Sequence, residues 1–363
     1  LAGTGKPNFS NGITINGAAV STLNVGEYNA SGTEPSSPQN GSIWWDTANE
    51  TIFIYIDGEF KETIAVSSTL LDGGTRGIYA GGETSSGSTD VIQYWTIDTA
   101  GNAADFGDLR TVGDQVTQDS YGFSDVTNGY IGSNWVAEIM TITIATTGNA
   151  TDYGDLTGVA RYSAGNSNGS VGIVAFGQKG GSVTNAIDRF SLGSATNASD
   201  HGDLIAARFT LGGNIADATN GLFHGGKDSG YSPVNVIEYV GIASAGNGTD
   251  FGDLTSTSPD TSGSSNNTRG IITKGYTDSG YVTDIDYLTI ATTGNSADFG
   301  DMTAALGIAK ACTSPTGRVT LSGGYSSARV NTIQYFDIST LGNATDFGDL
   351  TNSVWKGQSF SGT

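Results

Sequence analysis

The sequence contains very little cysteine and proline. Its 363 residues include one cysteine, Cys312, and 6 prolines. A single thiol cannot form a disulfide within the chain, so the fold has to be stabilised by packing. The residues around Cys312 show no catalytic context, and the chain has only two histidines, His201 and His224. We therefore expect Cys312 to be a buried, inert thiol.

Basic residues are also scarce. Fifteen Lys and Arg stand against 36 Asp and Glu, which gives a formal net charge of -21. Binding to nucleic acid needs clustered Lys and Arg, and this charge repels anionic membranes. No stretch approaches the roughly 18 apolar residues needed to cross a bilayer, and no basic-then-apolar signal segment opens the chain. We expect neither a nucleic-acid partner nor membrane insertion.

Glycine, in contrast, is abundant. The chain has 55 glycines, a share about twice the usual 7% or so. They accompany many Thr, Ser, Ile, Val and Tyr residues, which is typical of short strands joined by tight turns. The composition therefore indicates an all-β protein.

A four-residue pattern, Asp-aromatic-Gly-Asp, occurs six times and is here called the Asp motif. In the third copy His201 takes the aromatic position. The first acids of the six copies are Asp105, Asp152, Asp200, Asp250, Asp298 and Asp346. The second acids are Asp108, Asp155, Asp203, Asp253, Asp301 and Asp349. Successive copies are 47 to 50 residues apart, and an Asn always stands three residues before the first acid. Such a period indicates a repeat architecture.

Apolar residues recur at fixed distances before the Asp motif. Positions ten and eight before the first acid are apolar in every copy, as in Trp95 and Ile97, and predict a half-buried strand. An Ile thirteen residues before the acid is out of phase with them, so we expect a bulge or a face switch near Tyr94, Tyr239, Tyr287 and Tyr335. Paired glycines such as Gly81 and Gly82 suggest close backbone approach near a crowded axis.

The repeat length is similar to that of a kelch-type blade and predicts an all-β, six-bladed β-propeller over residues 69–363. The residues after Leu350 correspond to the strand that the first blade lacks. We therefore expect this C-terminal strand to complete the first blade and close the ring. Residues 34–68 predict a small β-hairpin module, with strands near 41–47, 51–56 and 59–61 and turns at 48–50 and 57–58. Residues 1–33 are too few for a core and are expected to be an attachment or oligomerisation arm.

The Asp motif resembles the Asp-box of sialidases and other propellers. Asp152, Gly154 and Thr157 match its Asp-x-Gly-x-x-Thr skeleton, whereas Arg110 and Ile205 replace the Thr in two copies. The box is a structural turn in that family, which implies that the twelve acids are structural repeat turns. We expect the Asn and the first Asp to accept bonds from turn amides, and the aromatic residue to pack on the blade beneath.

Two other interpretations of the acidic and titratable residues stay open. Carboxylates suit calcium, although each turn offers about two or three of the six to eight ligands that this ion takes. We therefore expect no cofactor, with calcium as the alternative. His201 is interpreted as a packing variant, and His224, which no other repeat shares, as a candidate for a ligand site. The eight Arg are scattered and no catalytic set emerges, so we expect no enzyme, although paired carboxylates for glycoside hydrolysis remain possible.

Four copies of the repeat resemble structural proteins of tailed phages, in particular marine cyanophages, in which Gly-Asn-Ala-x-Asp-Phe-Gly-Asp-Leu-Thr recurs. They are residues 101–109, 148–157, 294–303 and 342–351, and residues 35–47 resemble a short module of phage tail-fibre proteins. The resemblance implies a virion protein at the particle surface and a homo-oligomer, trimeric at the arm. Its partners would be other virion proteins and a host glycan or receptor.

Two alternatives to this non-catalytic binding role remain. One is a glycan-active propeller enzyme, and the other is an architectural tail collar or nozzle. In each case we expect the binding site in the parts that differ between repeats rather than in the Asp motif.

Overall fold

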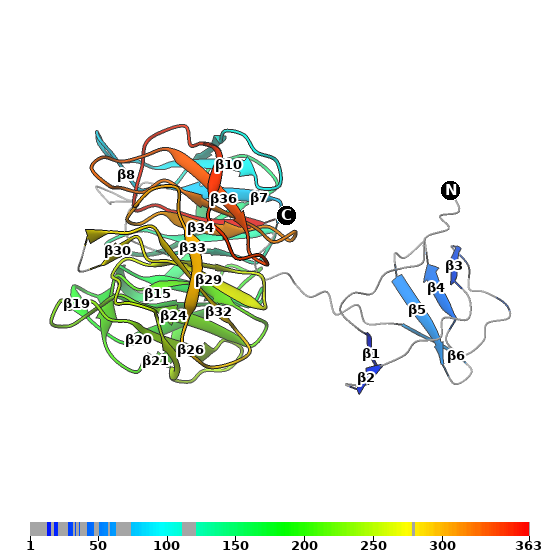
Figure 1. Ribbon diagram of the computed structural model, residues 1–363. Helices are drawn as coiled ribbons and strands as arrows, with labels where there is room; N and C mark the ends of the chain where they lie inside the picture. The colour runs from blue at the N-terminus through cyan, green and yellow to red at the C-terminus, as the bar shows by residue number, and fades with distance from the viewer. Residues whose placement is uncertain are drawn as a thin grey trace. The chain divides into compact units, whose positions relative to one another are not determined.

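The computed structural model describes residues 13–15, 18–20, 28–31, 33, 36, 42–46, 51–56, 59–62, 74–110, 121–277 and 280–362. The chain divides into two compact units, Leu1–Ser68 and Thr69–Thr363 (Figure 1). The described residues form strands and no helix, so none of them belongs to a helix that could span a membrane.

The described residues of the first unit form six strands. Strands β1 (Ile13–Ile15) and β2 (Ala18–Val20) form a hairpin. A second sheet joins β3 (Tyr28–Ser31), β4 (Ile43–Asp46), β5 (Thr51–Ile56) and β6 (Glu59–Glu62). The three predicted strands are confirmed, whereas the predicted turns at 48–50 and 57–58 lie outside the described residues. Strand β3, from the segment assigned to the arm, pairs in parallel with β4 and belongs to this sheet.

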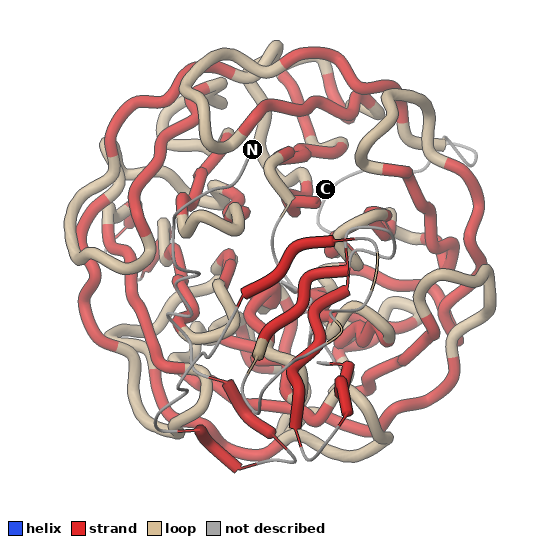
Figure 2. Tube along the Cα trace, turned by 90° about the vertical axis from the view of Figure 1, so that its right-hand side faces the viewer, coloured by secondary structure: helices blue, strands red, loops and turns tan. Residues whose placement is uncertain are grey.

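The second unit is a six-bladed β-propeller, as predicted. Six antiparallel sheets lie around a ring (Figure 2). Five of them have four strands, and the sheet of blade 2 has six because the long strand β15 also pairs with a small hairpin of β18 (Gln178–Lys179) and β19 (Ser182–Val183). The innermost strands of blades 1 to 6 are β38 (Gln358–Gly362), β12 (Gly122–Ser124), β16 (Ala164–Ser167), β23 (Gly212–Ala216), β28 (Ser262–Ser265) and β34 (Lys310–Thr313). Each of them contacts the innermost strands of the two neighbouring blades, so these six strands surround the axis.

The other three strands of each blade follow outwards. The second strands are β7 (Arg76–Ala80), β13 (Asn128–Gly132), β17 (Val171–Ala175), β24 (Asn220–His224), β29 (Arg269–Thr273) and β35 (Arg318–Ser322). The third strands are β10 (Val91–Thr96), β14 (Val136–Thr143), β20 (Ala186–Ser191), β26 (Val236–Gly241), β32 (Asp284–Thr289) and β36 (Thr332–Asp337). The outermost strands are β11 (Ala104–Asp108), β15 (Thr151–Arg161), β21 (Ser199–Asp203), β27 (Thr249–Asp253), β33 (Ala297–Asp301) and β37 (Thr345–Asp349).

The ring is closed by its C-terminal strand. Strand β38 pairs along its whole length with β7, from Gln358 opposite Ala80 to Gly362 opposite Arg76. The last segment of the chain thus becomes the innermost strand of the first blade, as predicted. Pairing removes the exposed inner edge that β7 would otherwise present.

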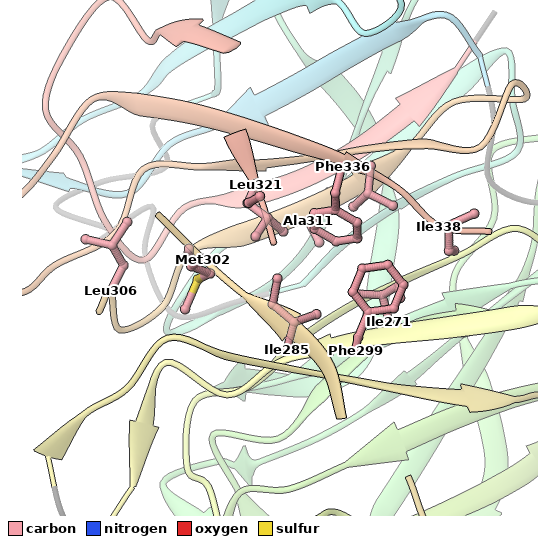
Figure 3. Packing of buried hydrophobic residues seen from close by; sticks show 12 residues of the cluster. Ile271, Ile285, Phe299, Met302, Leu306, Ala311, Leu321, Phe336 and Ile338 are labelled. Carbon is pink, nitrogen blue, oxygen red and sulfur yellow. The ribbon is translucent and has the colours of Figure 1, made fainter. Parts of the chain in front are cut away.

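The hydrophobic core lies between the blades. Ile285 and Phe299 of blade 5 pack against Leu321, Phe336 and Ile338 of blade 6 (Figure 3). Packing on both faces of a blade also explains why the Ile column is out of phase with the other apolar columns. Ile92 packs with blade 2, while Trp95 packs with blade 6 from the other face of β10. Both faces of a blade are covered, so the strand is buried on two sides rather than one. Full burial of each such side chain contributes about 1.5–3 kcal/mol.

The axis is filled by small side chains of the innermost strands. The Ser124 hydroxyl donates to the Ser361 carbonyl at 2.6 Å, and the Ser361 hydroxyl donates to the Thr313 carbonyl at 2.6 Å. The hydroxyls of Ser264 and Thr313 lie 2.6 Å apart. These residues are buried. Small hydroxyls let the backbones approach closely while each polar group finds a partner in the next blade.

The paired glycines lie elsewhere than predicted. They follow the second strand of a blade, and at Gly82 (φ 103°) an added Cβ would lie 2.5 Å from the Trp355 carbonyl oxygen. Trp355 belongs to the segment that enters blade 1 from blade 6. The close approach is confirmed, but it is to this connecting segment and not to the axis.

Candidate functional site

The Asp motif is a strand and not a turn, which corrects the prediction. In every copy the two acids belong to the outermost strand of a blade. In blade 1, Gly107 lies opposite Ile92 and Asp105 opposite Gln93, so Phe106 is the extra residue of a β-bulge. The same register shift recurs in the other five blades. The predicted bulge therefore exists, one to two residues from the predicted tyrosines, and its extra residue is on the neighbouring strand.

The Asp motif binds the next blade. The Asp108 amide donates to Asn149 Oδ1 at 3.0 Å, Gly148 N donates to the Phe106 carbonyl at 2.8 Å, and Ala150 N donates to the Asp108 carbonyl at 2.8 Å. The amide-to-Asn bond recurs as Asp155 to Asn197, Asp203 to Asn247, Asp253 to Asn295, Asp301 to Asn343 and Asp349 to Asn102. The repeated Asn therefore accepts from the preceding blade rather than from its own turn, and the six bonds form a belt around the ring.

The motif glycine is required by this belt. The six glycines have φ between 146° and 155°, a region that favours glycine. At Gly107 an added Cβ would lie 2.5 Å from the Gly148 carbonyl oxygen of the next blade. The close approach between blades is thus a second reason for glycine, beside its φ.

A second contact between blades follows each motif. The amide five residues after the first acid donates to a buried acid or amide side chain on the third strand of the next blade. The pairs are Thr157 to Asp188, Ile205 to Glu238, Thr255 to Asp286, Thr303 to Gln334 and Thr351 to Gln93. Blade 2 has Met140 at this position, and there Arg110 of blade 1 pairs with Glu138 at 3.3 Å instead. Arg110, which replaces the usual Thr of the repeat, thus has a different partner in the next blade.

Each buried acid in this column has its own cation. Asp286 is 3.1 Å from Lys274, Glu238 is 2.5 Å from Arg208, and Asp188 is 3.7 Å from Lys179. No ion pair of Gln93 or Gln334 is possible, because these side chains are neutral. A buried charge is costly unless it is paired. An acid in this column therefore occurs together with a nearby cation.

Four arginines also join neighbouring blades. The guanidinium groups of Arg76, Arg189, Arg269 and Arg318 donate to the carbonyls of Ile144, Ala243, Ile338 and Ile97, respectively. Three of them also lie over a tyrosine of their own blade, as Arg269 does over Tyr287 at 4.7 Å. These cations have structural roles in the ring.

The acids of the Asp motif do not gather into a metal site. The first acid of every copy is exposed on an outermost strand. Within the described residues there is no group of three His, Cys, Asp or Glu that could hold a metal ion. Burial, followed by the nearby Asp90 and Asp105, raises the pKa of Asp108. Charged side chains on edge strands discourage pairing with other chains, which gives the repeated first acid a physical role.

The two histidines and the cysteine are buried. His201 occupies the place of the other motif aromatics, and burial lowers its pKa. Cys312 is buried, with its thiol 3.2 Å from the Thr320 hydroxyl. His224 is 0% exposed, and its Nδ1 is 2.9 Å from the Thr261 hydroxyl and its Nε2 is 3.3 Å from the Gly213 carbonyl. Burial lowers the pKa of His224 to about 3, so the ring is neutral and links blades 4 and 5.

One face of the ring differs from the rest. We call it the entry face: it comprises the starts of the innermost strands, the segments that enter them from the preceding blade, and the loops between second and third strands. These parts contact one another, as in the bonds from Glu83 N to the Trp355 carbonyl and from Gly226 N to the Ser258 carbonyl. Among the described residues seven large hydrophobic side chains are exposed, and six of them belong to this face, namely Trp135, Val159, Ile205, Tyr231, Tyr276 and Tyr281.

Aromatic side chains form two arcs on the entry face, here called the aromatic rim. In the first arc Arg161 lies 4.8 Å from the Trp135 ring and 4.2 Å from the Tyr162 ring, and Phe209 connects Tyr162 to Tyr231. The second arc runs through Tyr276, Tyr281, Tyr325 and Trp355, with ring centroids 4.7 to 6.0 Å apart. Together the arcs contain residues contributed by blades 2 to 6.

Five residues of the entry face share a strained backbone. They stand ten residues after the first acid and two before an innermost strand, and are Tyr162, Thr210, Asp260, Ile308 and Lys356, with φ between 54° and 61°. This left-handed conformation costs a non-glycine residue about 1–2 kcal/mol. Each is half-buried, whereas the residue that follows it is buried. The chain is rich in glycine, yet side chains of five different kinds are kept here.

A small cavity lies on the axis at the entry face. Its volume is about 30 Å³, room for roughly one water molecule. The starts of all six innermost strands line it, and the lining residues include Tyr121, Ser163, Asn214, Lys310 and Gln358. The Asn214 side chain also donates to the Ser359 carbonyl of blade 1 at 3.3 Å. The cavity thus lies where all blades meet.

No protein-family model matches the chain, and no curated protein matches it significantly. The function therefore has to be inferred from the propeller and its entry face. Sequence reasoning missed both the aromatic rim and the left-handed column. The column has a fixed distance of ten residues from the first acid, but no residue type repeats in it that could have marked it in the sequence.

Proposed function

We propose that the protein is a structural protein of a tailed-phage virion, displayed at the particle surface, and that its propeller is a non-catalytic recognition module. The entry face would contact a host glycan or another virion protein. The single observation that carries this proposal is that, of the seven large hydrophobic residues exposed in the described part of the chain, six gather on that face. Exposed apolar patches with aromatic residues mark binding surfaces.

The left-handed column supports the same surface. A strained backbone persists only where its surroundings impose it, and such strain gathers at functional sites. In five blades the strain recurs while the side chain changes from Tyr162 to Thr210, Asp260, Ile308 and Lys356. A constant backbone that presents a variable side chain is suited to recognition. It also agrees with the expectation that the site lies in the parts that differ between repeats.

The polar residues favour a binding module over an enzyme. Arg76, Arg189, Arg269 and Arg318 are engaged between blades, and the first acids of the Asp motif are spread over the outermost strands. We propose no cofactor and no nucleic-acid partner. We further propose that the chain forms a homo-oligomer, a trimer, through its N-terminal arm, which would display several entry faces together and raise avidity.

A binding assay with the full chain tests this function. The labelled protein is added to host cells and to immobilised host glycans, and to virions that lack it. The variant Tyr231→Ser removes the most exposed rim residue (67% exposed), and Leu341→Ser removes an exposed apolar residue (54%) of the opposite face as a control. We expect Tyr231→Ser to weaken binding at least tenfold, as loss of a hot-spot aromatic does, and Leu341→Ser to leave it unchanged.

Other outcomes would point to the alternatives. Equal binding by both variants would exclude the entry face. Release of reducing sugar from the glycans would establish a glycan-active enzyme and overturn the non-catalytic role. Incorporation into virions without any binding to cells, with electron microscopy placing the ring in the tail, would favour an architectural collar or nozzle.

A further inference from the structure

Three tyrosines of blades 5 and 6 form one surface at the end of the second aromatic arc. Tyr276 and Tyr281 lie opposite each other in the hairpin of β30 (Tyr276–Thr277) and β31 (Gly280–Tyr281), with ring centroids 5.3 Å apart. The Tyr281 ring lies 6.0 Å from the Tyr325 ring of the next blade. Tyr276 and Tyr281 are 38% and 39% exposed, so this surface faces solvent.

Backbone contacts hold the three rings in place. Gly307, in the segment that enters blade 6, exchanges two backbone hydrogen bonds with Tyr325, at 2.7 and 2.9 Å. A Cβ at Gly307 would lie 2.7 Å from Cε1 of Tyr281, so the Tyr281 ring lies against this backbone. The Tyr276 carbonyl accepts from the buried Ser258 hydroxyl at 2.7 Å. A ligand therefore meets rings whose positions are set before it binds, which lowers the entropic cost of binding.

The polar groups near these rings suit a cation. Asp260, of the left-handed column, stands in the segment that enters blade 5. Burial raises the pKa of the Tyr281 hydroxyl, and the neighbouring Tyr325, Tyr276 and Asp260 raise it further. Phenol oxygens and a carboxylate accept hydrogen bonds, and the faces of aromatic rings are negative. Each of these features favours a ligand group that is positively charged.

The protein itself uses arginine for contacts of this kind. In four pairs a guanidinium carbon lies 4.2 to 4.7 Å from a tyrosine ring centroid: Arg76 with Tyr94, Arg161 with Tyr162, Arg269 with Tyr287 and Arg318 with Tyr335. Among the described residues, no Lys or Arg lies in this way over Tyr276, Tyr281 or Tyr325. A cation on these three rings would therefore come from another molecule.

The other end of the second arc carries its own cations. Arg329 and Lys356 lie over the Trp355 ring, and both form ion pairs with Glu83. Their charges are thus partly neutralised within the chain, on the far side of Tyr325 from the hairpin. The hairpin end, beside Asp260, is the part of the arc that suits a further cation.

The charge of the chain favours a basic protein as the source of that cation. The formal net charge of -21 attracts basic molecules. A choline headgroup also suits aromatic rings, but its phosphate would be repelled by Asp260. An arginine side chain combines a planar cation that stacks on rings with five donors for hydroxyls and carboxylates. Arginine therefore fits both the rings and their polar neighbours.

We propose that Tyr276, Tyr281, Tyr325 and Asp260 form a binding site for an arginine side chain of a partner protein. The guanidinium would lie on the tyrosine rings and donate hydrogen bonds to the hydroxyls and to the Asp260 carboxylate. This inference rests on the proposed recognition role of the entry face. It adds the class of partner that the second arc takes and the chemical group that the arc recognises.

Titration with a matched pair of peptides tests the proposal. Two pentapeptides with blocked ends carry either arginine or citrulline between glycines, and citrulline has nearly the same shape without the charge. They are titrated into the full chain, and binding is followed by NMR and calorimetry. We expect the arginine peptide to bind about ten times more tightly, because only it offers a cation to the rings and a charged donor to Asp260.

Two variants separate the carboxylate from the rings. Asp260→Asn removes the charge, and Asn tolerates the left-handed backbone. Tyr281→Leu replaces a partly exposed ring by an apolar side chain without a π-face. Each should weaken binding of the arginine peptide about fivefold or more and leave the citrulline peptide unaffected. Asp298→Asn makes the same charge change on the exposed outermost strand of blade 5 and should bind both peptides normally.

The possible failures are distinguishable. Equal binding of the two peptides, or full binding of the arginine peptide by Asp260→Asn and Tyr281→Leu, would overturn the arginine site. An equal loss in Asp298→Asn would also overturn it, since the net charge alone would then attract the peptide. Tighter binding of phosphocholine than of the arginine peptide would overturn a protein as the partner. If Tyr231→Ser still weakened binding to cells or virions in any of these cases, the proposed function would stand without the arginine site.

Discussion

Asn102 and Asp349 are 247 residues apart in the chain, and the side-chain oxygen of Asn102 accepts a 3.0 Å hydrogen bond from the Asp349 amide. The bond joins the last blade to the first on the outside of the ring. On the inside, β38 pairs with β7. The propeller is therefore closed twice, by its C-terminal strand at the axis and by the Asp motif at the circumference.

The closing bond should matter more than its five equivalents. Blades 4 and 5 are joined by the same bond, from Asp253 to Asn295, but there the chain also runs from β28 through the rest of blade 5 to Asn295. In blade 1, by contrast, β38 is joined to the strands that precede Asn102 by its pairing with β7. We expect Asn102→Ala and Asn295→Ala each to cost about 1 kcal/mol of global stability. Only Asn102→Ala should greatly speed hydrogen exchange at Gly101 and Ala103, whose amides bind the last blade. Equal exchange in the two variants would contradict a special role for the closure.

The motif glycine gives a second prediction. At Gly252 (φ 151°) a Cβ would lie 2.4 Å from the Gly294 carbonyl oxygen of the next blade. Gly252→Ala should therefore lower the free energy of unfolding by about 1–3 kcal/mol, because strain and a clash act together. Gly241→Ala is the control, since nothing lies within 4 Å of that position. Thermal unfolding of both variants checks this, and a stability loss of the same size in Gly241→Ala would refute the explanation.

The sequence predicted the blades because the repeat is visible in it, but it could not identify the partner of the motif. Asn149 lies three residues before one copy of the motif and 41 residues after Asp108 of the previous copy. In a periodic sequence a contact within one copy and a contact between successive copies leave the same pattern. Only the fold decides between them, and it places Asn149 against Asp108.

The left-handed column was hidden for a different physical reason. In a sequence, a position with positive φ is normally identified because it is occupied by glycine. The five positions of the column are occupied by other residues, namely Tyr162, Thr210, Asp260, Ile308 and Lys356. Their side chains differ in size and charge, so no residue type repeats. The aromatic rim was also invisible, because Trp135 and Tyr231 come from loops between second and third strands, and the sequences of these loops are not shared by all six blades. The parts that we propose for recognition vary between blades, whereas the repeat shows only what is shared.

The matched buried charges lead to a third prediction. Lys274 lies 3.1 Å from Asp286, and both are buried. Lys274→Met should cost about 3–5 kcal/mol, because it leaves the carboxylate buried without a counter-charge. Adding Asp286→Gln gives blade 5 the neutral side chain that Gln334 supplies in blade 6, and should recover most of that loss. Urea unfolding of the single and double variants measures the coupling. Additive losses in the double variant would show that the two charges act independently.

The neutral state of His224 predicts how the propeller responds to acid. Its pKa is lowered by burial to about 3 in the folded chain, against an ordinary value of about 6.5. Above pH 6.5 the ring is neutral in both states and costs nothing. As the pH falls below 6.5, the unfolded state binds a proton that the folded state cannot, so stability falls by about 1.4 kcal/mol per pH unit until the pH nears 3. We expect His224→Gln, which cannot titrate, to be less stable than the wild type at pH 7.5 but to lose less stability between pH 6.5 and pH 4. Chemical unfolding at several pH values checks this, and parallel pH profiles for the two proteins would show that His224 does not set the acid response.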